Sequence, residues 1–153
     1  HYFLAAPDTR KIATAILNYN GLHHLKNYLR SHEINSLNEV IVIDNASTDG
    51  SIDFLKKEFS DVNRISLNNN LGFAEGYNQG IHQIGTKYTA IVNSDVRVSE
   101  DWLVPIIKAL DQDDSIAAVQ PKYYLLKTLL NLNMPEVQEV LLIAWDIHFA
   151  EEE

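Results

Sequence analysis

The sequence contains no cysteine, which excludes disulfide bonds, thiolate metal sites and cysteine nucleophiles. It is also poor in positive charge, with 12 Lys and Arg residues against 21 Asp and Glu residues and a net charge of -9 at pH 7. DNA, RNA and anionic membranes need a basic surface, so this balance argues against all three as the main partner. An acidic protein can still bind phosphate groups when a divalent cation lies between them.

Long apolar runs are missing as well. No uncharged apolar run approaches the roughly 18 residues of a membrane span, and residues 1–10 lack the sustained apolar stretch of a secretory signal. We therefore expect no transmembrane segment and a cytoplasmic location, either free or peripheral to the inner face of the membrane. Because the chain does not begin with Met, we also expect it to be a trimmed or incomplete form of a longer protein.

Signature motifs of several enzyme classes are absent from the sequence. It has no His-Glu-x-x-His pattern, no Walker Gly-x-x-x-x-Gly-Lys and no Gly-x-Gly-x-x-Gly after a strand. This disfavours zinc hydrolases, P-loop NTPases and dinucleotide oxidoreductases. His23 and His24 follow the first predicted strand, but adjacent positions on a helix point in different directions and make a poor metal pair.

The 153 residues, 46% hydrophobic and 22% charged, are typical of one globular domain with a substantial core. Strands are predicted at residues 12–17, 40–44, 62–67, 88–92 and 115–120. A helix with the apolar stripe Leu22, Leu25 and Leu29 follows the first strand, and further helices are predicted at residues 51–59, 73–84 and, after a Ser99 cap, 100–110. This alternation indicates an α/β fold with a mostly parallel sheet flanked by helices.

The chain divides into three predicted segments. Residues 1–10 are an irregular or non-native N-terminal segment, residues 11–124 form the α/β domain, and residues 125–153 form a tail. Pro135 interrupts the tail, which is expected to form two amphipathic helices or a helix and a strand. Within the domain, Gly76 and Gly80 each cost roughly 1 kcal/mol in a helix interior, so they indicate close backbone packing or close approach to a ligand.

Two aspartates mark a candidate binding site. Asp44 ends the β-branched run 40–43, and Asp95 follows the strand at residues 88–92. Either aspartate alone is as well explained by a turn or a helix cap, but on separate strands of one sheet they are expected to point into one crevice. One carboxylate can accept the imide N–H of uracil or thymine, and another can hold Mg²⁺ or Mn²⁺ on a diphosphate. Tyr19 is either a stacking partner for the base or a buried tyrosine with a bonded hydroxyl.

Four motifs resemble family 2 glycosyltransferases in order and approximate spacing. They are Asn18–Gly21, Ile43–Ser51, Asn70–Gly80 and Val92–Asp95, and the resemblance covers roughly residues 11–124. It implies the Rossmann-like GT-A fold and an inverting, metal-dependent enzyme that uses a nucleotide-diphospho-sugar donor, here a UDP- or dTDP-sugar. The motif forms are most similar to the rhamnosyltransferase-type subset. The resemblance further implies a saccharide or lipid-linked acceptor and a role in cell-wall or polysaccharide biosynthesis.

The resemblance assigns roles to individual residues. Leu17, Asn18 and Tyr19 would line the nucleobase pocket, and Asp44 would bond the base. The wall near the ribose and diphosphate would be shaped by Asn70, Gly72, Gly76 and Asn78. Asp95 would ligate Mg²⁺ or Mn²⁺, with Asn93 near the ribose or a metal-bound water.

The sequence departs from the family pattern at two positions and in its acceptor half. Asn93 replaces the first Asp of the Asp-x-Asp motif, and Tyr77 stands where many members carry an Arg. The family places its general base further along the chain, so we expect much of the acceptor half to be lacking, with Glu151, Glu152 and Glu153 as weak candidates for the base. Two alternatives stay open: a non-catalytic nucleotide-sugar-binding module and a nucleotidyltransferase. The nucleotidyltransferase is disfavoured because the first strand is not followed by a Gly-rich loop bearing Lys or Arg.

Overall fold

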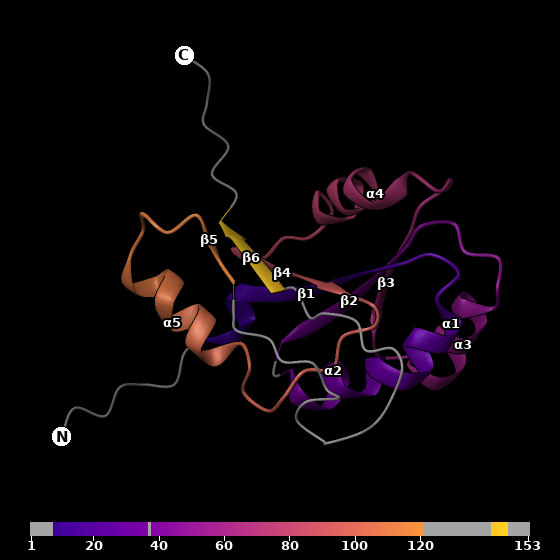
Figure 1. The fold of residues 1–153 in the computed structure, drawn as a ribbon, viewed down its shortest axis with the longest axis horizontal. Helices are drawn as coiled ribbons and strands as arrows, with labels where there is room; N and C mark the ends of the chain where they lie inside the picture. The colour runs from indigo at the N-terminus through magenta and orange to yellow at the C-terminus, as the bar shows by residue number, and fades with distance from the viewer. Residues whose placement is uncertain (1–7, 37, 121–141, 147–153) are drawn as a thin grey trace, which may run out of the picture.

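A computed structural model describes residues 8–36, 38–120 and 142–146 (Figure 1). Its described residues form a six-stranded sheet in the order β3-β2-β1-β4-β6-β5. Parallel pairing joins β1 (Ile12–Asn18), β2 (Glu39–Asp44), β3 (Asn63–Ser66) and β4 (Tyr88–Asn93). β6 (Leu142–Asp146) runs antiparallel to both of its neighbours, β4 and β5 (Ala118–Val119). The predicted mostly parallel sheet is thereby confirmed.

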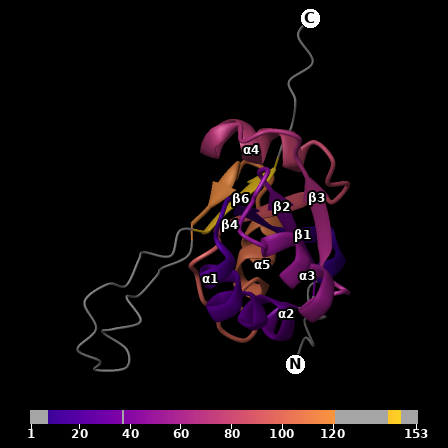
Figure 2. The same ribbon diagram turned by 90° about the vertical axis from the view of Figure 1, so that its right-hand side faces the viewer.

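Helices cover both faces of the sheet. The helical segments are η1 (Thr9–Lys11), α1 (Leu22–His24), the π-helical turn η2 (Leu25–Leu29), α2 (Arg30–Asn35), α3 (Ser51–Glu58), α4 (Gly72–Ile81) and α5 (Val104–Gln112). In Figure 2, α4 lies on one face, and α1, α2, α3 and α5 lie on the other. This cover explains the unbroken apolar runs of the central strands, because a parallel sheet is buried on both sides.

The larger hydrophobic core lies between the sheet and the helices α3 and α5, which cover one of its faces. The predicted stripe on the first helix contributes Leu25 and Leu29, which are each 1% exposed, whereas Leu22 is only partly buried. α3 contributes Leu55 and α5 contributes Ile107, both fully buried. The apolar spacing of the first helix therefore identified its inward face, with two of the three stripe residues buried.

The prediction for the helix at residues 100–110 was wrong at its start. α5 begins at Val104 rather than at residue 100, so Ser99 does not cap it. The Val104 N–H donates to the carbonyl of Asp101 at 3.0 Å, which closes a turn ahead of the helix. Pro105 explains the position, because proline has no N–H to donate and is favoured in the first turn of a helix.

α4 lies unusually close to the sheet because of its two glycines. A Cβ atom on Gly80 would lie 2.3 Å from Cδ1 of Ile43 on β2, and one on Gly76 would lie 3.0 Å from Cδ1 of Leu17 on β1. Close backbone packing, one of the two reasons predicted for these glycines, is thus present. The helix also ends at Ile81 rather than at residue 84, because the N–H groups of Gln83 and Ile84 donate in three-residue turns.

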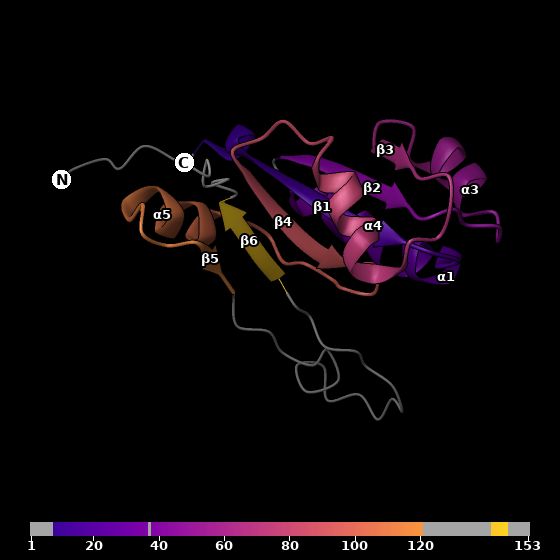
Figure 3. The same cartoon turned by 90° about the horizontal axis from the view of Figure 1, so that it is seen from above.

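β6 joins part of the predicted tail to the sheet. Leu142 is paired with Val92, and Asp146 with Tyr88, so β6 points the opposite way to β4 (Figure 3). The remainder of the predicted tail, including Pro135 and Glu151 to Glu153, lies outside the described residues. In the part of the chain that the structure describes, no helix is both long and apolar enough to cross a membrane.

Candidate functional site

The parallel strands end at one edge of the sheet, which places their polar terminal residues together. β1 is followed by β2 on one side, and β4 returns to the other side of β1 after β3. The connections therefore diverge between β1 and β4, where α/β sheets bind ligands. A cavity of about 380 Å³ opens at this position, lined by Leu17, Tyr19, His24, Asn45, Asn70, Gly72, Phe73, Asn93, Ser94 and Asp95. Its volume is in the range typical of small-ligand sites.

The structure brings most of the predicted donor residues to this cavity. Predicted residues on its wall are Leu17, Tyr19, Asn70, Gly72, Asn93 and Asp95. Tyr19 is 50% exposed, so its ring is accessible rather than buried in the core. Asn18, Asp44 and Gly76 are buried and Asn78 is exposed on α4, and these do not line the cavity.

Asp44 is held by neutral donors at the end of β2. It is only 3% exposed, and it faces Asn18 in the register of the two strands. The Asn18 side-chain amide donates to Asp44 Oδ1 at 3.1 Å, and the Ser47 backbone N–H donates to Oδ2 at 3.0 Å. Each carboxylate oxygen has a further lone pair, so the group keeps the capacity to accept another N–H.

Asn18 is buried with an unmatched acceptor. Its Nδ2 donates to Asp44 and also to the Ser47 hydroxyl at 3.0 Å, whereas its Oδ1 has no hydrogen-bond partner. A Cβ atom on Gly21 would lie 2.6 Å from this oxygen, so only glycine leaves room for it. Asn18 therefore fixes the Asp44 carboxylate through its amide nitrogen.

Asp49 has a structural role in the same motif. Its carboxylate accepts from the Leu22 N–H at 2.9 Å and the Ser51 N–H at 3.0 Å, and also from the Ser51 hydroxyl. Burial raises the pKa of Asp49, but the hydrogen bonds from Ser51 and Leu22 outweigh it and hold the pKa below its usual value. Asp49 thus ties the start of α1 to the start of α3.

Asn45 is a wall residue whose role the sequence analysis missed. Its Nδ2 donates to Asn70 Oδ1 and to the Gly72 carbonyl, each at 2.9 Å, and its Oδ1 accepts from the Leu71 N–H at 2.9 Å. Asn45 therefore clamps the loop that forms one wall of the cavity. Its place directly after Asp44 in a polar motif was the available signal.

Tyr77 stands where many family members carry an Arg, and its hydroxyl holds two strands of the sheet together. Its hydroxyl donates to the Val92 carbonyl at 2.8 Å and accepts from the Leu17 N–H at 3.2 Å, so it bridges β4 and β1 near their carboxyl ends. The side chain is 3% exposed, and burial raises the pKa of its hydroxyl well above the usual value. Phe73 packs edge-on against this ring at 5.0 Å and is itself 63% exposed beside the cavity.

Asp95 is the acidic residue of the cavity wall. The described residues give its half-buried carboxylate no hydrogen-bond donor and no cationic partner, and no Lys or Arg lines the cavity. His24, which the sequence analysis dismissed, lines the same cavity. Burial and the neighbouring His23 lower the pKa of His24, and the Asp95 carboxylate raises it by a smaller amount.

The side chains of the cavity wall fit a metal ion that a bound ligand also coordinates. Among the described residues, no group of three or more His, Asp or Glu side chains could hold a metal ion by itself. Asp95 supplies one carboxylate, and Asn93 and Ser94 bring further oxygen atoms to the cavity. Mg²⁺ and related ions often bind through one or two carboxylates plus substrate phosphates and waters, which this set allows.

The fold and the site define an α/β domain with a cavity between β1 and β4. The family described as glycosyl transferase family 2 matches residues 15–146. That range is most of the chain, so the chain belongs to this family. No curated protein sequence matches the chain.

Solved glycosyltransferases share the GT-A fold with this chain. The mannosyltransferase PcManGT from Pyrobaculum calidifontis, solved with GDP-Man and Mn²⁺, aligns with a TM-score of 0.69 and 20% identity over 92% of this chain and 46% of its own. TarS from S. aureus, solved with UDP, aligns with a TM-score of 0.60 and 21% identity over 71% of this chain and 34% of its own. These likenesses show the fold, and the chain spans less than half the length of either structure.

Proposed function

We propose that this domain binds a nucleotide-diphospho-sugar in the cavity between β1 and β4 and transfers the sugar to an acceptor hydroxyl with inversion. The observation that carries the proposal is the Asp95 carboxylate, which the described residues leave without a cation in a cavity at the β1/β4 switch point. A divalent cation bound there, Mg²⁺ or Mn²⁺, would neutralise the charge that develops on the departing diphosphate. We also propose that the chain belongs to the rhamnosyltransferase-type subset of the family.

The nucleobase end of the donor is proposed to lie beside Tyr19, at the end of β1. The exposed ring offers a stacking surface. The Asp44 carboxylate, fixed by Asn18, is 3% exposed and does not line the cavity, so it accepts an N–H of the base only if the base reaches past the wall to the end of β2. This pairing favours uracil or thymine, whose N3 carries a hydrogen, so UDP or dTDP should bind more tightly than ADP or GDP. The structural relatives are recorded with both a guanine and a uracil nucleotide, so they leave this choice to experiment.

The chemical step is a single displacement at the anomeric carbon. The acceptor oxygen forms a bond to that carbon and loses its proton to a carboxylate base, while the bond to the diphosphate oxygen breaks. Asp146 is an unsuitable base, because it is paired with Tyr88 at the far end of β4 from Asn93, about 16 Å away at the usual strand rise. Glu151 to Glu153 stay the proposed candidates.

A non-catalytic nucleotide-sugar-binding module is the second candidate. It is favoured by the cavity wall itself, on which Asp95 is the only carboxylate among the described residues. If that carboxylate binds the cation, the described wall offers no second carboxylate to accept the acceptor's proton. An acceptor that is poorly held would also admit water, which makes slow donor hydrolysis the expected residual activity of the 153-residue chain.

Release of UDP from UDP-sugars in the presence of Mn²⁺ separates the two candidates. A transferase should release UDP faster when saccharide acceptors are added, and it should form a glycosylated product with inverted stereochemistry. A binding module should show a rise in melting temperature with UDP and Mn²⁺ but no release above the background. Transfer of sugar without any need for a divalent cation would contradict the proposed site.

A further inference from the structure

His24 and Asp95 line the same cavity, and among the described residues neither side chain holds the fold together through hydrogen bonds. His24 ends α1, which follows β1, and Asp95 follows β4, so the two residues flank the switch point of the sheet. The two groups are close enough for the carboxylate to act on the imidazole electrostatically. Among the described residues, no hydrogen bond engages either side chain.

The imidazole of His24 is oriented by neighbouring rings. It stacks on Tyr28 one turn further along the helix, with ring centroids 6.3 Å apart and an interplanar angle of 30°. It also lies against the His23 ring, at a centroid distance of 3.6 Å. His23 is exposed and does not line the cavity, so the two adjacent histidines differ in what they can reach.

We propose that His24 is a second protein ligand of the cation that binds at Asp95, and that it makes this site prefer Mn²⁺ to Mg²⁺. The inference rests on the proposed function, since the cation is the one shared with the donor diphosphate. It gives the site a ligand that the Asp-x-Asp position lacks, because Asn93 replaces one carboxylate there. Of the residues that line the cavity, His24 is the only one that offers an imidazole nitrogen to this cation.

The expected selectivity follows from ligand chemistry. Mg²⁺ prefers an octahedron of oxygen atoms and gives up water reluctantly, whereas transition-metal ions accept an imidazole nitrogen more readily. An oxygen-only site made from Asp95, a diphosphate and water would serve both ions. Adding the nitrogen of His24 should therefore strengthen Mn²⁺ binding and leave Mg²⁺ binding nearly unchanged.

Pulsed electron paramagnetic resonance of the Mn²⁺ and UDP complex of the whole chain tests the proposal directly. The spectrum should contain the coupling of an imidazole nitrogen bound to Mn²⁺. That coupling should vanish in His24→Ala and persist in His23→Ala, which removes the same kind of side chain from the adjacent position. UDP is a suitable probe because its uracil ring offers the ion no imidazole-type nitrogen.

Metal titrations in the presence of UDP give a second readout. His24→Ala should weaken Mn²⁺ binding about tenfold while changing Mg²⁺ binding less than about twofold, and His23→Ala should change neither. If Mn²⁺ and UDP bind but the nitrogen coupling is absent, or survives in His24→Ala, the inference about His24 is wrong and the proposed function stands. If neither Mn²⁺ nor UDP binds the parent chain, both are wrong.

Discussion

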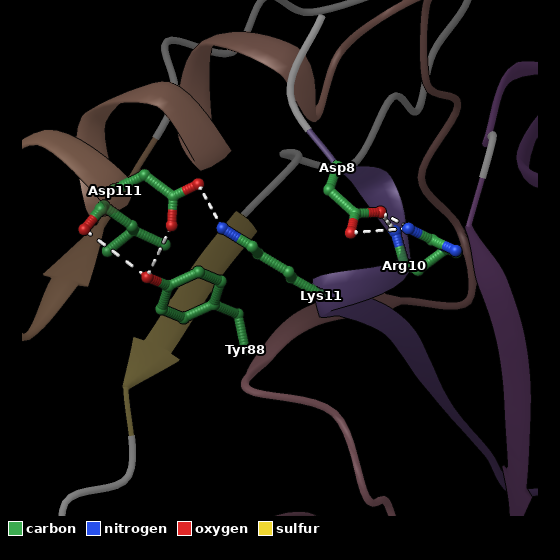
Figure 4. Close-up of polar contacts among 6 residues, drawn as sticks. Asp8, Arg10, Lys11, Tyr88 and Asp111 are labelled. Carbon is green, nitrogen blue, oxygen red and sulfur yellow. Dashed lines mark hydrogen bonds and ion pairs between the residues drawn. The ribbon is translucent and has the colours of Figure 1, made fainter.

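The two edges of the parallel sheet differ in whether the chain supplies their carboxylates with a cationic partner. At the amino edge, where β1 and β4 begin, Asp111 accepts from Lys11 Nζ at 2.9 Å and from the Tyr88 hydroxyl at 3.1 Å, and Asp8 pairs with Arg10 at 2.8 Å (Figure 4). At the carboxyl edge, Asp95 has no cationic partner among the described residues. Asp111 and Asp8 are thus paired within the chain, whereas in the proposed function Asp95 is paired by a bound cation.

Ionisation at the amino edge is stabilised by the chain itself. The hydrogen bond from Lys11, followed by that from Tyr88, lowers the pKa of Asp111. The hydrogen bonds from Arg10 lower the pKa of Asp8 in the same way. Removing such a surface partner should affect stability and not binding, whereas removing Asp95 should affect binding and not stability. The contrast can be tested at both edges with the same type of substitution.

The largest effect is expected for Asp95→Ala. Binding of UDP in the presence of Mn²⁺, measured by calorimetry, should weaken by at least about 100-fold, or about 2.7 kcal/mol, because the only carboxylate of the described cavity wall is lost. Asp111→Ala at the opposite edge is the matched control and should leave the affinity unchanged. Equal losses in the two variants would show that the edges do not differ as described.

Acid should destabilise the fold through His32, which supports the carboxyl edge. His32 is 1% exposed, and its Nε2–H donates to the carbonyl of Val96 at 3.0 Å, directly after Asp95. Burial lowers the pKa of His32 to about 4 from 6.5. The neutral form is therefore favoured in the folded state, so its contribution is complete above pH 6.5 and is lost as the pH falls toward 4.

Urea denaturation at two pH values measures this contribution. The free energy of unfolding should fall by about 2 kcal/mol between pH 7 and pH 5 on account of His32 alone. His32→Gln keeps an amide donor for the Val96 carbonyl but does not titrate, so its loss of stability over the same interval should be smaller by that amount. An unchanged pH dependence in this variant would refute the assignment.

Tyr77→Phe should lower stability, because the Tyr77 hydroxyl at the carboxyl edge stabilises the fold. The substitution removes the hydroxyl that bridges the Leu17 N–H and the Val92 carbonyl. A loss of about 1 to 2 kcal/mol in the free energy of unfolding is expected for two buried hydrogen bonds. Tyr19→Phe removes a hydroxyl from a half-exposed side chain and should change stability by less than about 0.5 kcal/mol. Similar values for the two variants would contradict the supporting role of Tyr77.

The smallest effect is expected for Lys11→Ala at the amino edge. Its ion pair with Asp111 is partly exposed, with side-chain exposures of 40% and 28%. Solvent screening limits such a pair to less than about 1 kcal/mol, which thermal denaturation at low and high salt should reveal as a small, salt-dependent decrease. A loss much larger than this would mean that the amino edge carries more of the stability than its exposure suggests.

The parallel strands, and the end of the sheet at which the cavity lies, could be predicted from local sequence. Runs such as Val40–Ile43 bury both sides of a strand, and a carboxylate at the end of such a run must lie at the carboxyl edge. The start of α5 was missed because a weak signal, a Ser99 cap, was preferred over the stronger constraint of Pro105. Local sequence patterns therefore predicted the structure best in strands that are buried on both faces.

Side-chain partners across the fold were beyond the reach of local pattern. Asn45 clamps the loop at Asn70 through contacts about 25 positions apart, and Tyr77 links β1 to β4. His24 was set aside because only its neighbour His23 was considered as a partner, whereas the fold brings it to Asp95. Such pairs depend on register and helix rotation, which sequence spacing within one element does not supply.

The central claim is that the carboxyl edge is completed by a cation and a nucleotide diphosphate together. Calorimetric titration of UDP into the unmodified chain, first with Mn²⁺ and then with the cation chelated, tests it most directly. We predict saturable binding with Mn²⁺ and a loss of at least about 100-fold in affinity after chelation, about 2.7 kcal/mol. Equal affinity with and without the cation, or no binding in either case, would contradict the account.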